Sequence, residues 1–427
     1  MAIARSFLAF LLVSVAIAQP LDEAHRKRNL DSFDVVWTTI RDRHWQKQPG
    51  GLDWEAIRNE YRPRVERAET KQAARQAMTE MLGRLHQTHF GIFPSEVYES
   101  TSGDGAPAGT ATIGIDVRIL GGEAVVTRLE PGSPAEKIGI RRGWVLASVE
   151  GKDLAEPIKI LLAAFKDALT LDLMTSRAIL SRLQGPAGES VRVEFIDGAG
   201  KRIKLAVPRE EPRGQIAKFG NLPGMHVWFE SKKIEGSEYI AFNMFFDPPR
   251  LISGFGDAVS SCMKCDGLVI DLRGNPGGIG GMAIGMAGWL IDKKNARLGT
   301  MYTRETQLNF VVNPRIETFT GPVAVLVDGT SASTSEIFAG GLKDLGRARI
   351  FGTRTAGAAL PSVITKLPNG DGFQYAQANY ISEGGKPLEG IGVIPDDEVK
   401  LTKEALLAGH DPVLEAALHW IDRSKKP

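Results

Sequence analysis

The sequence predicts a mixed α/β protein with an N-terminal helical region, a β-rich insert and a C-terminal α/β core. Apolar residues recur at three- and four-residue intervals between residues 30 and 85, which is typical of amphipathic helices. Short β-branched runs such as TIGIDVRI and RVEFID dominate the segment that follows. Beyond it, apolar strands alternate with helical segments, the pattern of a covered sheet. The boundaries we predict are 1–18 for a signal peptide, 19–100 for the helical region, 106–212 for the β-rich domain and 213–427 for the core.

The charge balance argues against several kinds of partner. Of 427 residues, 43% are hydrophobic and 24% are charged, as in a soluble globular protein of two or three domains. Lys and Arg number 52 and Asp and Glu 51, so the formal net charge is +1. Nucleic acids and anionic membranes attract a strong basic excess or patch. We therefore expect no nucleic-acid partner.

The first residues have the pattern of a secretory signal. Arg5 precedes an apolar run over 7–15, and Ala16-Ile17-Ala18 follows it. A positive start, a short apolar core and small residues at this spacing predict cleavage after Ala18. The apolar run is too short to span a membrane as a helix. We expect an exported protein, periplasmic or secreted, without an integral membrane anchor.

Helices are predicted for Leu30 to Gln46 and for Trp54 to Leu85. The helical pattern ends in LHQTHFGIFP, where Gly91 and Pro94 interrupt it, and the Gly- and Ser-rich stretch 101–110 is typical of a linker.

The β-rich segment contains LEPGSPAEKIGIRRGWVLASVEG, with a short helix starting at Ser133-Pro134 and a turn at Gly143. This stretch resembles the core of a PDZ domain. The resemblance implies that backbone amides at Ile113, Gly114 and Ile115 capture the terminal carboxylate of a peptide, which clustered N–H groups at a strand edge favour. The region 156–184 is longer and more helical than in a minimal PDZ domain, and a purely structural role is the alternative.

The core is predicted from the strands YIAFNMF, GLVIDLRG, VAVLVDG and ARIFGT and from the helix PRLISGFGDAVSSC. Cys262 and Cys265 are the only cysteines and lie between that helix and the strand GLVIDL. Two cysteines cannot form a four-cysteine zinc site. We interpret them as a structural pair, bridged or buried, and a redox C-x-x-C motif is the alternative.

Two segments of the core could carry chemistry. GLVIDLRGNPGG ends in a glycine turn that can present backbone N–H groups to a ligand. In VLVDGTSASTSE a helix begins near Ser333, and Ser333 with Glu336 has the pattern of a capping box. The same position suits a nucleophile, because the free amides and dipole of a helix start stabilise a developing oxyanion.

Together these segments resemble, in chain order, the tail-specific (C-terminal processing) and tricorn serine protease superfamily. The resemblance rests on DLRGNPGG, SASTSE, GTRTAGA and LEGIGVIPD, and it covers nearly the whole chain after the signal. It implies a crotonase/Clp-protease-like α/β core with Ser333 as the nucleophile. It also implies an oxyanion hole formed by the amide of Thr334 and by that of Gly277 or Gly278.

The base distinguishes the branches of that superfamily. In the tail-specific branch a lysine follows the serine, and Ala358 occupies its position here, which excludes a serine–lysine dyad at this place. Lys366 lies on a predicted strand before the hairpin turn Asn369-Gly370. The tricorn-like branch uses a histidine after a hydroxyl residue and a later glutamate. The matching residues are His89 with Thr88 and Glu389, and His86 is the competitor of His89.

The prediction is therefore an exported serine peptidase that acts by way of an acyl-enzyme on peptides or proteins and engages their free C-termini. A base of ordinary imidazole pKa would make activity rise near pH 6 to 7. The histidines form no HExxH or other metal-ligand pattern, and we expect no metal or cofactor. Two alternatives remain: a catalytically inactive peptide-binding or scaffolding protein on the same fold, and an acyl-transfer or acyl-CoA enzyme of crotonase-like fold.

Overall fold

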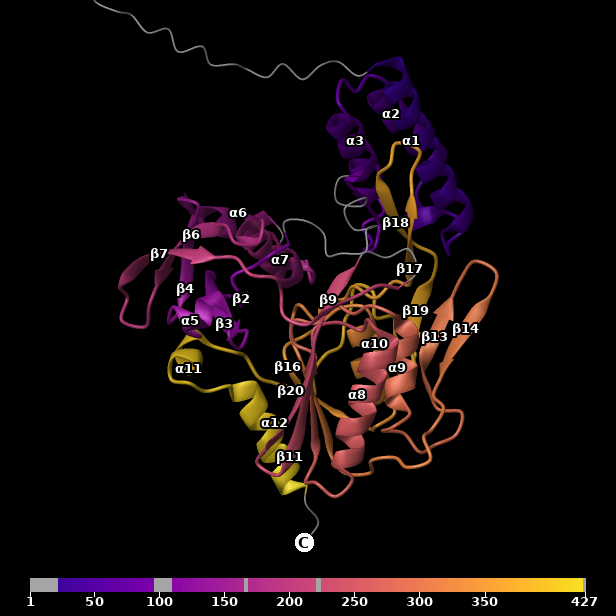
Figure 1. The fold of residues 1–427 in the computed structure, drawn as a ribbon. Coiled ribbons are helices and arrows are strands. Elements are labelled where there is room, and N and C mark those ends of the chain that lie inside the picture. The colour runs from indigo at the N-terminus through magenta and orange to yellow at the C-terminus, as the bar shows by residue number, and fades with distance from the viewer. Residues whose placement is uncertain (1–21, 96–109, 165–167, 220–223, 425–427) are drawn as a thin grey trace, which may run out of the picture.

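The computed structural model describes residues 22–95, 110–164, 168–219 and 224–424. Figure 1 shows three units: a helical bundle, a β-rich unit beside it and an α/β core below both. The predicted signal peptide and nearly all of the predicted linker 101–110 lie outside the described residues. Among the described helices, none is long and apolar enough to cross a membrane.

The N-terminal bundle contains three helices where two were predicted. The predicted helix over 54–85 is interrupted after Glu66, and Thr70 caps the next helix by accepting the N–H of Ala73 at 3.0 Å. The indoles of Trp37 and Trp54 each donate to the other residue's carbonyl, at 2.9 and 3.1 Å, and join the first two helices. The bundle consists of α1 (Glu23–Arg43), a 3₁₀ turn (Pro49–Gly51), α2 (Trp54–Glu66) and α3 (Lys71–Gly83).

A hairpin from the C-terminal half completes the core of this bundle. The predicted turn at Asn369-Gly370 is confirmed, between β17 (Ser362–Lys366) and β18 (Gly372–Ala376). Strand β1 (Gly91–Phe93) pairs with β18, and Phe373 is buried among the bundle's apolar side chains. Figure 1 shows the hairpin rising between the helices. The helical region therefore depends on residues far along the chain for its core.

The β-rich unit has the predicted strands and the predicted long helical part. Its sheet order is β2-β3-β4-β6-β7, so β2 is an edge strand, and α7 lies against β2. Ser133 caps the short helix, as the sequence predicts. The elements are β2 (Ile115–Leu120), β3 (Glu123–Leu129), α5 (Pro134–Lys137), β4 (Val145–Val149), β5 (Lys152–Asp153), α6 (Ala155–Ala164), α7 (Leu171–Leu183), β6 (Ser190–Ile196) and β7 (Arg202–Pro208).

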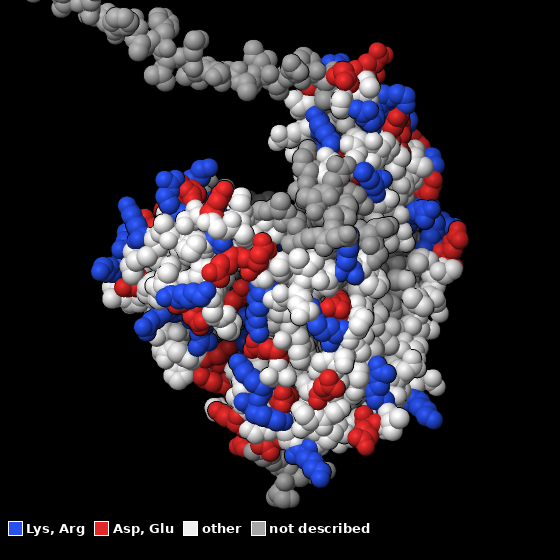
Figure 2. Space-filling view, in the orientation of Figure 1, with Lys and Arg blue, Asp and Glu red and all other residues white. Residues whose placement is uncertain are grey.

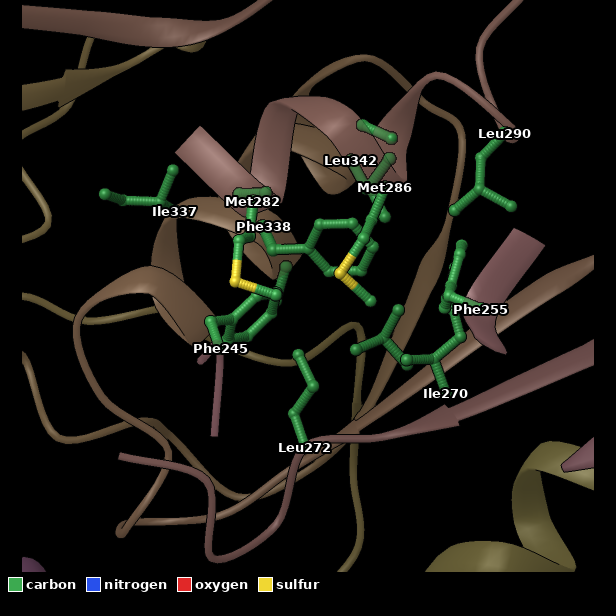
Figure 3. Close-up of a cluster of buried hydrophobic side chains, with 14 of the residues drawn as sticks. Phe245, Phe255, Ile270, Leu272, Met282, Met286, Leu290, Ile337, Phe338 and Leu342 are labelled. Carbon is green, nitrogen blue, oxygen red and sulfur yellow. The ribbon is translucent and has the colours of Figure 1, made fainter. Parts of the chain in front are cut away.

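The core is a six-stranded sheet in the order β10-β11-β12-β15-β16-β20, parallel except for the β10–β11 pair. Side chains of a strand alternate between faces. In β15, Val325 faces the cluster under α8, α9 and α10, whereas Leu326 faces α12. Figure 3 shows part of the first cluster, to which Phe245, Phe255, Phe338 and the strand residue Ile270 belong. The elements are β10 (Phe229–Ile234), β11 (Ser237–Phe242), α8 (Pro248–Ser261), β12 (Leu268–Asp271), α9 (Gly280–Ala287), β15 (Val323–Val327), α10 (Thr334–Asp344), β16 (Arg349–Gly352), β20 (Asp397–Glu398) and α12 (Pro412–Arg423).

The sequence did not predict a second layer of strands. The hairpin of β13 and β14 pairs with β19, and Arg304 in its turn donates to the carbonyls of Arg41 and His44 at the end of α1, at 2.8 and 2.9 Å. The hairpin thereby fastens the bundle to the core. The remaining elements are β8 (Gln215–Ala217), β9 (Met225–Val227), β13 (Arg297–Tyr302), β14 (Gln307–Val311), β19 (Asn379–Ser382) and α11 (Lys403–Leu407).

Cys262 and Cys265 form a disulfide at the end of α8, in agreement with the structural pair that the sequence predicts. Positive and negative side chains are interspersed over the face of the molecule in Figure 2.

Candidate active site

Ser333 lies at the junction between β15 and α10, with a strained backbone. Its φ of 55° and ψ of −118° are unusual for a residue other than glycine. From Gly329 to Leu342 every residue except Ser333 is buried, and Ser333 is half-buried. A serine held on a tight strand-to-helix turn and presented to solvent has the geometry of a nucleophile.

The buried carboxylate of Glu336 stabilises this turn through hydrogen bonds. Its carboxylate accepts four hydrogen bonds: from the N–H groups of Ser333 (2.9 Å), Gly357 (2.8 Å) and Ala358 (3.0 Å) and from the hydroxyl of Thr355 (2.6 Å). Burial raises the pKa of Glu336 to about 7, although these hydrogen bonds act in the opposite direction. The sequence predicted Glu336 only as a helix cap, whereas the structure shows that it joins the Ser333 turn to the loop 355–358.

The glycine turn after β12 packs directly on Ser333. A Cβ added to Gly277 would lie 2.7 Å from both Ser333 Cβ and Thr334 N, so only glycine fits there. The Thr334 hydroxyl donates to the carbonyl of Gly278 at 2.8 Å and holds the turn against α10. The predicted oxyanion-hole residues are thus neighbours.

Asn275 narrows the choice between the two glycines. Its side chain accepts the N–H of Gly277 at 2.9 Å, so that amide is already occupied. Gly278 is exposed, and within the described ranges the N–H groups of Gly278 and Thr334 have no acceptor. Of the two glycines that the sequence offered as oxyanion donors, Gly277 has its N–H occupied in this structure, and Gly278 is the one whose N–H is free, among the described residues, beside that of Thr334.

Sequence reasoning missed Asn275. It is fully buried, donates to the Phe242 carbonyl at 2.9 Å and accepts the Ser335 hydroxyl at 3.0 Å. It therefore links the glycine turn, β11 and α10. The one feature of the sequence that could have indicated this role is an amide side chain directly before Pro276 in a glycine-rich turn.

Thr88, His89 and Glu389 form a hydrogen-bonded relay. Glu389 accepts the hydroxyl of Thr88 at 2.9 Å and the N–H of Thr88 at 2.8 Å. The same hydroxyl lies 2.7 Å from Nδ1 of His89. A hydroxyl has one proton to donate. Because that proton goes to the carboxylate, Nδ1 of His89 is the donor to Thr88, and Nε2 is left unprotonated, as a general base requires.

The loop 358–359 connects this relay to Ser333. The Ser333 N–H donates to the Ala358 carbonyl at 2.8 Å, and the N–H of Ala359 donates to Glu389 at 3.1 Å. Ser333 Oγ and the His89 ring make no hydrogen bond in this structure. The relay is therefore assembled beside the serine but not in direct contact with it.

The surroundings of His89 favour its neutral form. His89 is half-buried and has a φ of 61°. Withdrawal from water and, secondly, the positive charge of Arg177 lower the pKa of His89 to about 4. Burial raises the pKa of Glu389 despite the hydrogen bonds from Thr88 and Ala359. An imidazole that is already neutral at physiological pH can accept a proton.

The hydrogen bonds that form the relay involve neither of the competing residues. His86 is exposed, and Lys366 lies exposed at the end of β17. Ala358 is buried in an apolar cluster with Leu173, Ala332 and Ala356.

The β-rich unit contacts the loop that leads to Ser333. Arg118 on β2 donates to Asp328 at 2.8 Å and to Asp116 at 2.7 Å. Burial of Asp328 disfavours its charged form, but Arg118 and the surrounding hydrogen bonds outweigh burial, so the pKa of Asp328 lies below its ordinary value. The predicted peptide-binding residues Ile113, Gly114 and Ile115 are buried, and a Cβ on Gly114 would lie 2.2 Å from Ser133 Cβ.

A cavity of ≈ 860 Å³ lies between β2, the start of α7 and the ends of β15 and β16. Gly329 and Thr355 line it, whereas Ser333 and His89 do not. We place the candidate site at Ser333 and the relay, and not in this cavity. The hydrogen bonds of the relay and the strained backbone of Ser333 indicate catalysis more directly than the size of a cavity does. Among the described residues, no three His, Cys, Asp or Glu side chains are grouped to hold a metal ion.

Two family models match this chain. Residues 239–399 match the model of peptidase family S41, and residues 26–83 match that of the tricorn protease C1 domain. The first range contains Ser333 and Glu389, and the second contains most of the helical bundle.

Curated proteins and a solved structure agree with these matches. A probable CtpA-like serine protease of Staphylococcus aureus is 28% identical over 295 residues, which are 68% of this chain and 53% of that protein. The chloroplastic C-terminal processing peptidase of Tetradesmus obliquus is 28% identical over 392 residues, 88% of this chain and 77% of that protein. The chain thus spans about half the length of the S. aureus relative. The structure of the photosystem II D1 C-terminal processing protease aligns with a TM-score of 0.59 at 24% identity, over 92% of this chain and 96% of the other. It confirms the predicted mixed α/β fold with N-terminal helices.

Proposed function

Because this chain is a homologue of the serine peptidases of family S41, we propose that it hydrolyses peptide bonds through an acyl-enzyme on Ser333. Ser333 Oγ attacks the scissile carbonyl carbon while His89 Nε2 takes the hydroxyl proton. His89 then gives that proton to the leaving amine as the C–N bond breaks. A water molecule, deprotonated by His89, then attacks the acyl carbon; the bond from that carbon to Ser333 Oγ breaks, and His89 returns the proton to Oγ as the product carboxylate leaves.

The observation that carries this proposal is the relay from Glu389 through the Thr88 hydroxyl to Nδ1 of His89, at 2.9 and 2.7 Å. It orients the ring, and Glu389 stabilises the imidazolium that forms during proton transfer. Catalytic hydrogen bonds are often completed only when substrate binds. The step from this structure to the reactive one is therefore the approach of His89 Nε2 to Ser333 Oγ.

The amides of Gly278 and Thr334 are the proposed oxyanion donors. Two N–H groups that have no acceptor among the described residues can stabilise the negative oxygen of the tetrahedral intermediate beside Ser333. The tricorn-like assignment follows from the same residues, since Ala358, at the position of the lysine of the tail-specific branch, is packed among apolar side chains.

Peptides and proteins are the proposed substrates, held in part by the PDZ-like unit through a free terminal carboxylate at 113–115. Because these residues are buried, such capture requires the loop to open. The test measures the affinity of the full-length Ser333→Ala variant for a peptide with a free C-terminus and for the same peptide with an amidated C-terminus. Equal affinities would mean that the unit has a structural role.

Export with cleavage after Ala18 is likewise proposed, and mass measurement of the exported protein should show Gln19 at its start.

Fluorophosphonate labelling tests the central proposal, because the probe reacts with activated serines. The wild type should be labelled, and Ser333→Ala should not be. In His89→Ala the labelling rate should fall about 10²- to 10⁴-fold. For peptide hydrolysis, the variant that combines Ser333→Ala and His89→Ala should lose no more activity than the more impaired single variant, since the two residues act as a unit. His86→Ala and Lys366→Ala are the matched controls. A wild type that remains unlabelled would favour the inactive scaffold, and loss of labelling in Lys366→Ala would overturn the choice of base.

A further inference from the structure

The first turn of α7 packs on the loops that carry Ser333. Leu173 forms a buried apolar cluster with Ala332, the residue before Ser333, and with Ala356 and Ala358. At the same end of the helix, a Cβ on Gly329 would lie 2.3 Å from an Asp172 carboxylate oxygen. The helix of the β-rich unit therefore lies against the catalytic loops as well as against β2.

Arg177 follows Leu173 by one helical turn. Residues four apart lie on one face of a helix, so Arg177 shares the face that Leu173 presents to the Ser333 loops. The positive charge of Arg177 acts on His89, whose pKa it lowers after the larger effect of desolvation. The packing of the first turn of α7 on the Ser333 loops therefore brings this guanidinium near the candidate active site, and its effect on the pKa of His89 agrees with that position.

Arg177 has no charged partner among the described residues. In the described part of the chain Arg177 forms no ion pair and no hydrogen bond. The residue Arg177 is exposed as a whole, but nearby protein atoms displace part of the water around its guanidinium group. This desolvation lowers the pKa of Arg177. A partly desolvated cation without a partner gains free energy when an anion binds, and the planar guanidinium fits a carboxylate through two parallel hydrogen bonds.

We propose that Arg177 binds a carboxylate of the peptide substrate beside the scissile bond and so determines substrate specificity. This inference rests on the proposed peptidase function. The carboxylate has two sources: a free C-terminus that lies beside the cleaved bond instead of at 113–115, or an Asp or Glu side chain near that bond. Both present the same chemistry to the guanidinium.

The test uses internally quenched decapeptide libraries in four versions. Acidic residues are present or replaced by Asn and Gln, and the terminus is a free acid or an amide. The variants are Arg177→Gln, Arg177→Lys and the control Arg182→Gln, an exposed arginine of the same helix five residues further on and on another face. Melting temperatures establish that all variants are folded.

The wild type should cleave one carboxylate-bearing version with about tenfold higher kcat/KM than its neutral counterpart. Arg177→Gln should lose this preference, Arg177→Lys should retain part of it, and Arg182→Gln should keep all of it. Loss on amidation identifies the C-terminus as the source, and loss on removal of Asp and Glu identifies a side chain. An equal effect of Arg177→Gln on all four versions, or no effect, would overturn the proposal.

Binding separates this inference from the proposed function. Fluorescein-labelled versions of the same libraries are titrated against Ser333→Ala and Ser333→Ala/Arg177→Gln by anisotropy. A carboxylate preference that disappears with Arg177 supports the site even if the wild type cleaves nothing. Equal affinity of acidic and neutral libraries for Ser333→Ala refutes it, whatever the outcome of fluorophosphonate labelling.

Discussion

The hydroxyl of Thr88 donates to Oε2 of Glu389 at 2.9 Å across 301 residues of sequence. The same hydroxyl accepts from Nδ1 of His89 at 2.7 Å, so one oxygen atom sets both the tautomer and the orientation of the ring. This contact joins the helical bundle to the core at the candidate active site.

Thr88 variants test the relay. Thr88→Val keeps the shape and the backbone N–H but removes the hydroxyl, and kcat should fall about 10- to 100-fold, as expected for loss of a hydrogen bond to a charged group. Thr88→Ser keeps the hydroxyl and should retain most of the activity. Peptide hydrolysis at saturating substrate measures both. Equal losses in the two variants would indicate a packing role instead.

The pH dependence should differ from that of an ordinary histidine base. In the proposed mechanism the neutral imidazole is the active form, and the pKa of His89 in the folded protein is lowered to about 4. The value of kcat/KM should therefore rise as pH rises through about 4 and be nearly constant between pH 6 and 8, whereas the sequence alone suggested a rise near pH 6 to 7. A measured midpoint between 6 and 7 would mean that solvent reaches the ring freely. The comparison is confined to pH values at which thermal unfolding shows a folded protein.

Two glycine substitutions test the contact behind Ser333. In Gly277→Ala the new Cβ would lie 2.6 Å from the Ala332 carbonyl at a φ of 93°, so the backbone must shift. A shift of about 1 Å at the nucleophile can lower the rate about 100-fold. Gly281→Ala in α9 meets nothing within 4 Å and should leave activity unchanged while stabilising the helix by up to about 1 kcal/mol. Unaltered kcat in Gly277→Ala would show that the turn adapts without disturbing Ser333.

Glu336→Gln should destabilise the protein in a pH-dependent way. The amide NH2 group can only donate, whereas both oxygens of a carboxyl can still accept when it is protonated, so at least one of the N–H groups of Ser333, Gly357 and Ala358 loses its partner, at about 1–3 kcal/mol. The pKa of Glu336 is raised from 4.5 to about 7 in the folded protein. The stabilising contribution of the protonated carboxyl is thus fully present below pH 4.5 and is lost as pH rises through 7.

Melting temperatures of the wild type and Glu336→Gln, measured at pH 5 and pH 8, give the comparison. The difference between them should be larger at pH 5. A difference that grows toward pH 8 would mean that the ionised carboxylate, with its four donors, is the stabilising form. The contribution of His89 is common to both proteins and cancels.

The sequence by itself determined the core strands β11, β12, β15 and β16, the helix α8, the hairpin turn at Asn369-Gly370 and the helix start at Ser333. These features follow from local periodicity, turn chemistry and capping, which neighbouring residues specify. The second strand layer, β13, β14 and β19, and the break between α2 and α3 were not predicted, because their signals are weaker than the packing that stabilises them.

Only the tertiary structure decided how the site residues are used. Which glycine amide is free depends on the side chain of Asn275, and whether Glu336 is only a cap depends on the loop 355–358 that packs on it. The pKa of His89 depends on burial and on the charge of Arg177, which comes from a different unit of the chain. Desolvation, Coulomb interactions and competition for hydrogen-bond donors act between groups close in space, and a sequence pattern records only which groups are close along the chain.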